Sequence, residues 1–233
     1  MMKFMNPDDE GEDLEQPLTA KVYRELRNRI IAGDLAPGER LRERELAVDL
    51  GVSRIPVRQA MPQLEADGFI TTRPRRGATV TQLTMRDIDE LFDVRLGVEV
   101  HATRLAARRV ASGVAPIFLR QAMGEADAAL ASGDPALIAE SNADFHEAVV
   151  QLADNVLLAT MTRRIAGRDR WVFRLTADRD PVVACQEHHE LCEAIYAGDE
   201  EFAAAISYSH IERGRKPTVD RLRAILPGPS PAD

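Results

Sequence analysis

Residues that favour β-strands are gathered in one short part of the chain, and this distribution constrains the fold most strongly. Segments 69–73 and 78–81 are rich in Ile, Thr and Val, and Pro74-Arg-Arg-Gly77 between them has the composition of a tight turn. Before this hairpin, apolar residues recur at helical spacing in three segments: 18–32, 43–50 and a segment that begins after Ser53. Three helices followed by a small β-hairpin predict a winged helix-turn-helix over residues 18–83.

From residue 84 onward the pattern is helical. Ala, Leu, Val and charged residues alternate at a helical period as far as residue 226, and five breaks divide this region into about six helices. Helices joined by short turns pack antiparallel to bury their apolar faces, so residues 84–226 are expected to form an all-α antiparallel bundle. The predicted fold class is mainly α. The acidic segment 1–17 and the proline-rich segment 227–233 are expected to be disordered tails.

Charge is distributed unevenly along the chain, although the formal net charge is −8 at pH 7. Residues 18–82 carry twelve Lys and Arg against eight Asp and Glu, whereas the segments on either side are acidic. Only the basic segment is suited to contact phosphates. The sequence has neither an apolar run long enough to cross a membrane nor the pattern of a signal peptide, so we expect a cytoplasmic protein with no membrane partner.

Eight arginines lie within 37 positions of the basic segment, from Arg40 to Arg76. The guanidinium group is a rigid fork that can contact guanine O6 and N7 together or hold a phosphate. Arg54 and Arg58 are four residues apart and therefore share one face of the helix that follows Ser53. Isolated arginine pairs commonly belong to a solvated surface, but the accompanying helices and hairpin favour a face that reads bases in the major groove.

Several motifs of the basic segment match a known pattern. They are the segments 33–41, 45–47, 51–58 and 68–77. They resemble the winged-helix domain of GntR-type transcriptional regulators. The resemblance implies that double-stranded operator DNA is contacted by Arg44, Ser53, Arg54, Arg58, Arg75, Arg76 and Gly77, with Arg75 and Arg76 on phosphates or in the minor groove.

Three residues depart from the family pattern, namely Ile55, Gln59 and Pro62. An interior proline removes a backbone hydrogen bond and costs roughly 3 kcal/mol, which kinks a helix or ends it early. Because the base-reading residues precede Pro62, we predict a bend beyond the DNA-facing turn, with DNA binding retained.

Three of the five histidines occupy helical positions that are expected to point inward: His146, His188 and His210. Asn142 lies one turn before His146 on the same face. A single inward histidine is commonly a core residue, but three from separate segments can converge inside a bundle. Neutral imidazoles are ligands for a divalent metal, and such a site has room for an oxygen donor and a small acid.

Motifs of the helical region match a second known pattern. They are Leu91–Arg95, Glu99, Asn142–His146, Asn155, Glu187-His188 and the stretch that ends at His210. They resemble the FCD effector domain of the FadR branch of GntR regulators. The resemblance implies a divalent metal such as zinc, nickel or manganese, bound by Asn142, His146, His188 and His210, with His189 and Asp144 as bystanders.

The details of this site leave alternatives open. Asn142 replaces the commoner Asp and removes one negative charge, so metal affinity should fall, or the histidines contact an effector carboxylate directly. In one interpretation Arg95 binds the effector carboxylate, next to the four candidate metal ligands, which also contact the effector. In the other, Arg95 is a buried partner of Glu99. Cys185 and Cys192 lie too far apart on one helix for a disulfide, so we expect free buried thiols, although a thiolate could reach the metal.

These features predict a transcription regulator, most simply a repressor, that binds a pseudo-palindromic operator as a homodimer and responds to a small organic acid in its helical effector-binding and dimerisation domain. In one alternative the regulator has a purely structural metal or no effector. In another the bundle is a metal-dependent hydrolase, although the sequence has no HExxH pairing and Glu147 lies on a different helical face from His146.

Overall fold

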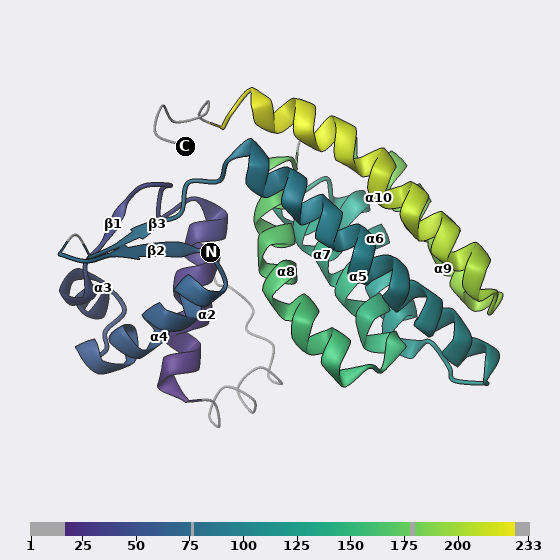
Figure 1. Ribbon diagram of the computed structural model, residues 1–233, viewed down its shortest axis with the longest axis horizontal. Helices are drawn as coiled ribbons and strands as arrows, with labels where there is room; N and C mark the ends of the chain where they lie inside the picture. The colour runs from purple at the N-terminus through teal and green to yellow at the C-terminus, as the bar shows by residue number, and fades with distance from the viewer. Residues whose placement is uncertain (1–16, 76, 178–179, 227–233) are drawn as a thin grey trace. The chain divides into compact units, whose positions relative to one another are not determined.

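The computed structural model describes residues 17–75, 77–177 and 180–226 of the chain, and these residues form nine helices and three strands. The chain divides after Gln82 into two compact units, one with helices and a sheet and one with helices alone (Figure 1). The predicted tails lie outside the described residues, apart from Pro17. None of the helices in the described ranges combines the length and apolar character that a membrane span requires.

The first unit contains three packed helices, α2 (Leu18–Ala32), α3 (Glu43–Asp49) and α4 (Arg54–Ala66). The apolar positions that recur at helical spacing form its core, where Leu26, Val57 and Leu64 are fully buried. α2 ends at Gly33, which adopts a left-handed φ of 88° that favours glycine. Within this unit, α3 and α4 follow each other closely and form the helix-turn-helix.

A three-stranded antiparallel sheet completes the first unit. β2 (Ile70–Arg73) and β3 (Gly77–Val80) form the predicted hairpin, in which Arg73 lies opposite Gly77. A third strand, β1 (Arg40–Leu41), pairs with the other edge of β3 and extends the sheet beyond the predicted hairpin. Two residues are too few to show the alternating pattern of a strand, so the sequence carries no signal for β1.

α4 continues from Arg54 to Ala66 with Pro62 in its interior. The helix does not end early at this residue: the Asp67 N–H donates to the Gln63 carbonyl at 2.9 Å and closes the last turn, and Leu64 in that turn is fully buried. Tertiary packing of this kind can offset the intrinsic cost of a proline. The bend predicted beyond the DNA-facing turn stays a prediction.

The described residues of the second unit form six helices, in agreement with the predicted number of about six. They are α5 (Met85–Ala111), α6 (Ile117–Ser132), α7 (Pro135–Ala153), α8 (Val156–Leu175), α9 (Pro181–Tyr196) and α10 (Glu200–Arg223). Side chains of Asp134, Asn155, Asp180 and Asp199 accept hydrogen bonds from the first-turn N–H groups of the helices that follow them. These caps fix the helix starts at the predicted breaks.

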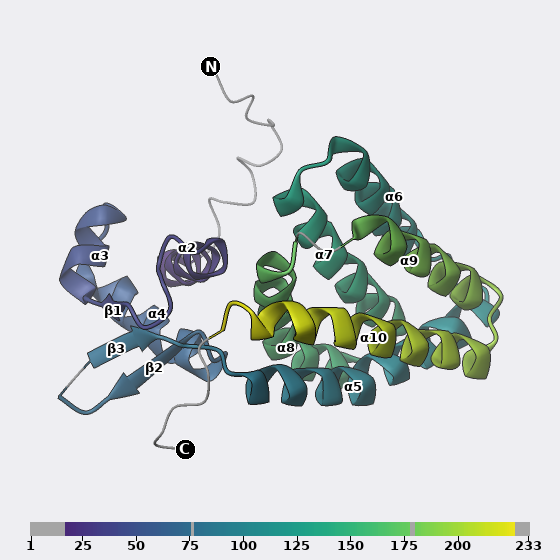
Figure 2. The ribbon, with the colours of Figure 1, turned by 90° about the horizontal axis from the view of Figure 1, so that it is seen from above.

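Four of the described helices of the second unit pack against α7. α7 contacts α5, α6, α8 and α9, while α5 and α10 run side by side in opposite directions (Figures 1 and 2). The main core contains Leu119, Phe145 and Ile195, each fully buried. Because α9 also contacts α5, α6 and α10, the inward faces of α5, α7, α9 and α10 meet in the middle of the bundle.

Candidate functional site

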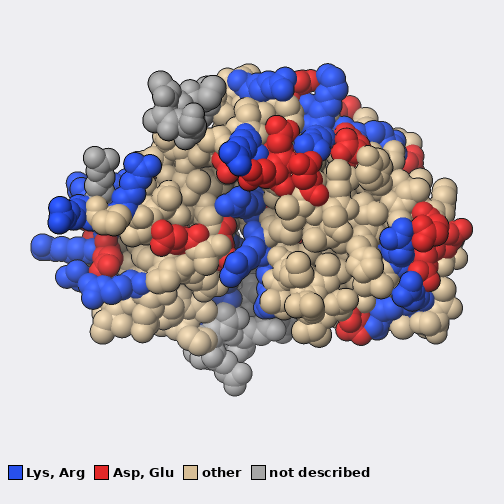
Figure 3. Space-filling view, viewed as in Figure 1, with Lys and Arg blue, Asp and Glu red and all other residues tan. Residues whose placement is uncertain are grey.

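The predicted DNA-contacting residues form an exposed surface on the first unit. Those that the structure describes are all exposed: Arg44, Ser53, Arg54, Arg58, Arg75 and Gly77. Ser53 is the N-cap of α4, so Arg54 and Arg58 project from its first two turns. Figure 3 shows basic side chains gathered at the end of this unit that carries α3 and the sheet. Arg76 lies outside the described residues.

A single carboxylate holds the two arginines of α4 on this surface. Glu43, the first residue of α3, has its Oε2 atom 2.8 Å from a terminal nitrogen of Arg58 and 3.5 Å from one of Arg54. The hydrogen bond from Arg58 lowers the pKa of Glu43, so the carboxylate is charged at neutral pH. The two arginine side chains remain 59% and 64% exposed, which leaves both within reach of a ligand in solvent.

The turn between β2 and β3 presents Arg75 in an unusual backbone conformation. Arg75 has a φ of 64°, and Gly77 follows with a φ of 79°. A residue with a side chain pays roughly 1–2 kcal/mol for this left-handed region, whereas glycine does not. Tight hairpin turns commonly contain a residue in this region, and here it leaves the Arg75 side chain exposed.

In the second unit the three predicted histidines converge. His146 from α7, His188 from α9 and His210 from α10 are all buried. Their ring centroids are 4.9–5.3 Å apart, and one ring nitrogen of each lies within 4.8 Å of those of the others. We call these three residues the histidine cluster. Its nitrogens are close enough together to bind one metal ion after small side-chain movements.

Two buried carboxylates orient the rings. The Nδ1 atom of His146 is 2.9 Å from Glu99, and the Nδ1 atom of His210 is 2.8 Å from Glu187. A carboxylate at Nδ1 keeps the proton on that nitrogen and leaves Nε2 with its lone pair, the arrangement found around many metal-bound histidines. Burial lowers the pKa of His146 to about 4, so its ring is neutral at pH 7. His146 therefore has the protonation state that metal binding needs.

Arg95 lies beside the histidine cluster but is engaged with buried acids. Its Nε atom is 2.6 Å from Glu99 and 3.4 Å from Asp169, and a terminal nitrogen is 3.3 Å from Nε2 of His146. Arg95 is therefore a buried partner of Glu99, which is the second of the two roles expected for it. Its guanidinium group is not free to hold the carboxylate of a ligand by itself. Burial raises the pKa of Asp169 to about 7, whereas the charge of Arg95 overcomes burial and lowers the pKa of Glu99.

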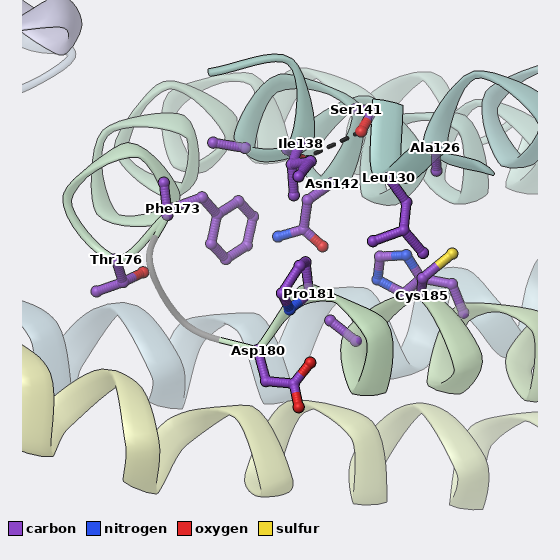
Figure 4. Close-up of a pocket in the computed structure, with 14 residues that line it drawn as sticks. Ala126, Leu130, Ile138, Ser141, Asn142, Phe173, Thr176, Asp180, Pro181 and Cys185 are labelled. Carbon is purple, nitrogen blue, oxygen red and sulfur yellow. Dashed lines mark hydrogen bonds between the residues drawn. The ribbon is translucent and has the colours of Figure 1, made fainter. Parts of the chain in front are cut away.

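A pocket lies next to the histidine cluster, between α6, α7, α8 and α9. Its volume is about 550 Å³ with the open mouth included, and its wall contains Asn142 and His188. Figure 4 shows the Asn142 amide directed into this space, near Phe173 and Ile138. His146 and His210 do not line the pocket, so His188 is the member of the cluster that connects the two.

The remaining candidates lie outside the histidine cluster. Asp144 pairs with Arg170, and His189 pairs with Asp127 on α6. Cys185 and Cys192 are free and buried.

Asp169 is a site residue that no sequence motif includes, and Glu187 belongs to the Glu187-His188 motif but had no role assigned to it. Each lies four positions before a buried residue of an inward face, Phe173 and Leu191 respectively. An acid at such a position needs a buried partner, and that is the signal that could have identified it.

The geometry defines a class of protein. A winged helix with exposed arginines is a double-stranded DNA-binding module, and the adjoining helical unit offers a pocket beside buried histidines. A chain that combines the two is a transcription regulator.

The family follows from comparison with known proteins. Residues 18–80 match the bacterial regulatory proteins of the gntR family, and residues 90–213 match the FCD domain. The chain belongs to the gntR family of bacterial regulatory proteins, with an FCD domain as its C-terminal part. It is a transcription regulator and not an enzyme, so the hydrolase alternative is wrong.

Three relatives illustrate the similarity. The Nta operon transcriptional regulator of Aminobacter aminovorans is 30% identical over 82% of this chain and 89% of its own length. The transcriptional repressor RspR of Escherichia coli K12 is 26% identical over 84% of this chain and 87% of its own. The crystal structure of a GntR transcriptional regulator from Rhodococcus sp. RHA1 has a TM-score of 0.73 at 28% identity and covers 88% of this chain and 98% of its own.

Proposed function

We propose that the protein is a repressor that binds a pseudo-palindromic operator as a homodimer and is controlled by a small organic acid bound beside a divalent metal in the FCD domain. The observation that carries this proposal is the convergence of His146, His188 and His210 next to a pocket. The relative RspR, which is named a transcriptional repressor, supports the direction of regulation.

In this proposal the arginines of the first unit divide into two groups. Arg54 and Arg58 lie on the first two turns of α4, the part of a recognition helix that reaches base edges. Arg44, Arg75 and Arg76 contact phosphates or the minor groove and fix the position of the helix. Ser53 and Gly77 allow the backbone to approach the DNA closely. A homodimer presents two such surfaces to half-sites one helical turn apart.

The histidine cluster, with borderline imidazole ligands, is suited to a divalent metal such as zinc, nickel or manganese. His146, His188 and His210 provide nitrogen donors, and the carboxamide oxygen of Asn142 provides a fourth donor from the pocket side. A metal in this site would supply a localised positive charge. Because all four ligands are neutral, that charge would be available to attract an anionic acid in the pocket.

Arg95 contributes to acid binding in a less direct way than a free fork would. Its guanidinium group adds positive charge next to the histidine cluster, but Glu99 and Asp169 already occupy its Nε side. We therefore infer that Arg95 contributes to effector binding through its positive charge and through its contact with His146.

Metal binding tests the first half of the proposal. The full-length protein, treated with a chelator, is titrated with Zn²⁺, Ni²⁺ and Mn²⁺ in a calorimeter. His146→Ala should weaken binding at the histidine cluster by at least about tenfold, whereas His101→Ala, on the exposed face of α5, should leave it unchanged. Equal affinities in the two variants would contradict the metal assignment.

Acid binding separates control by an effector from a purely structural metal. A panel of hydroxy, keto and sugar acids is screened by thermal unfolding of the metal-loaded protein. An acid that binds the folded state raises the melting temperature in proportion to the logarithm of its concentration above Kd. If no acid shifts the melting temperature although the metal binds, the metal is structural and the effector part of the proposal is wrong.

A further inference from the structure

A second group of metal-ligating side chains lies between α6 and α9, apart from the histidine cluster. Asp127 on α6 faces Cys185 and His189 on α9, and their ligand atoms all lie within 4.8 Å of one another. The Oδ1 atom of Asp127 is 3.3 Å from the Cys185 sulfur and 2.9 Å from Nε2 of His189. We propose that Asp127, Cys185 and His189 form a second metal site, selective for Zn²⁺ and similar cations, that links α6 to α9.

The spacing of the three side chains is close to that of a tetrahedral site. Zinc bonds of roughly 2.0 Å to nitrogen and oxygen and 2.3 Å to sulfur place neighbouring ligand atoms roughly 3.3–3.5 Å apart. The distances from Asp127 Oδ1 to the Cys185 sulfur, 3.3 Å, and to His189 Nε2, 2.9 Å, differ from these values by a few tenths of an ångström. Cys185 and His189 are four residues apart, so one face of α9 carries both donors.

The chemistry of the donors selects the cation. A thiolate, an imidazole and a carboxylate form a mixed set that suits Zn²⁺ better than Mg²⁺ or Ca²⁺, which prefer oxygen ligands. Burial and the neighbouring carboxylate of Asp127 raise the pKa of Cys185 to about 11. The thiol is thus protonated at neutral pH, and metal binding must release its proton to solvent as the sulfur–metal bond forms. Three protein ligands leave a fourth position for water.

The position of this site connects it with the pocket. Cys185 itself lines the pocket, as do Ala126 on one side of Asp127 and His188 on one side of His189. Figure 4 shows the Cys185 sulfur on the side of the pocket where Ala126 and Leu130 of α6 lie. A metal bound by Asp127, Cys185 and His189 would therefore fix two walls of the pocket with respect to each other. Its occupancy should change the affinity for a ligand in the pocket.

Cobalt spectroscopy tests the site directly, because Co²⁺ replaces Zn²⁺ and bonds to a thiolate give a charge-transfer band in the near ultraviolet. The full-length protein is reduced, stripped of metal and titrated with Co²⁺. We expect this band in the wild-type protein, its loss on addition of Zn²⁺, and its absence in Cys185→Ser. Cys192→Ser is the matched control, since Cys192 is a second buried thiol on the same helix, and it should retain the band.

Variants of the two half-exposed ligands keep the test valid if Cys185→Ser fails to fold. Asp127→Asn and His189→Gln should each weaken the cobalt affinity that gives the band by at least about tenfold. His146→Ala should leave the band intact, because the histidine cluster contains no sulfur; this variant distinguishes the second site from the first. A wild-type protein without the band, or a band that depends on Cys192 and not on Cys185, would overturn the proposal.

Discussion

The cost of burying charge determines which acidic residues at the site are ionised. Arg95 is buried with two carboxylates, those of Glu99 and Asp169. One guanidinium group can neutralise only one of them, and an unpaired buried carboxylate is costly. Glu99 makes the shorter contacts to Arg95 and also accepts from His146, so it retains the charge. Asp169 is left with the less favourable position, and its pKa rises in consequence.

The raised pKa of Asp169 predicts a pH-dependent stability. Burial raises this pKa from 3.8 to about 7, so the stabilising contribution is complete below pH 3.8 and is lost as the pH rises through 7. Asp169→Asn cannot ionise and should lose no stability in this range. Relative to the wild type, the variant should gain about 3 kcal/mol between pH 5 and pH 9, at about 1.4 kcal/mol for each pKa unit. Urea unfolding at several pH values measures the difference, and parallel curves would show that the pKa is not raised.

The ion pairs of Glu43 lead to a second prediction for a single residue, which concerns the affinity for DNA. Its carboxylate holds Arg54 and Arg58 in the free protein and would lie near DNA phosphates in a complex. Glu43→Gln should tighten binding to non-specific duplex DNA at low salt by roughly two- to fivefold, because both guanidinium groups are released and a repulsive charge is removed.

A matched variant separates these two causes. Glu45→Gln removes the same charge from α3, but Glu45 pairs with Arg42 and not with the arginines of α4. Fluorescence anisotropy on one DNA duplex should therefore show a smaller effect for Glu45→Gln. Equal tightening by the two variants would assign the effect to net charge alone.

Packing between elements depends on a few close approaches of backbone. The turn between α9 and α10 brings Gly198 against the end of α5, and Gly198 has a φ of 71°. A Cβ atom at this position would lie 2.9 Å from the Cβ and 3.1 Å from the Cα of Ala111. Since α9 carries His188 and α10 carries His210, this turn also sets how two members of the histidine cluster face each other.

Glycine substitutions test this element-scale account. Gly198→Ala should destabilise the protein by roughly 1–3 kcal/mol, because it adds both backbone strain and a clash with Ala111. Gly97→Ala is the matched control in the interior of α5, where a Cβ meets nothing within 4 Å, and it should stabilise the protein by about 0.5–1 kcal/mol. Urea unfolding of both variants measures the pair. A destabilised Gly97→Ala, or an unaffected Gly198→Ala, would contradict the packing described.

Much of the architecture could be predicted from the sequence because local signals agree with the fold. Helical periodicity, Asp and Asn caps and glycine breaks specify the six helices of the second unit, and His146, His188 and His210 occupy inward positions of three of them. Partners that depend on tertiary packing were not predictable. β1 exists only because β3 offers an edge, and the choice of Asp169 and Glu187 as buried acids follows from neighbours far away in the sequence.

At the scale of the whole molecule, regulation requires a coupling between DNA binding and ligand binding. A ligand in the FCD domain can release DNA only if it binds better to the arrangement that does not fit the operator. Couplings of 1–3 kcal/mol are typical and change affinity roughly 5- to 150-fold. The two units are joined directly, with β3 ending at Val80 and α5 beginning at Met85. Movement of α5, which carries Arg95 and Glu99, is therefore the shortest covalent route for that coupling.

The central claim is that arginines of the winged helix bind DNA while the histidine cluster controls that binding. Its most direct test is the affinity for DNA selected by the protein from a random pool, measured with and without Zn²⁺ and the acid that gives the largest thermal shift. We predict a roughly 5- to 150-fold change for the wild type, whereas His188→Ala binds the same DNA with unchanged affinity and does not respond to Zn²⁺ and the acid. A wild-type affinity that Zn²⁺ and the acid leave unaltered, or an equal response in His188→Ala, would contradict the account.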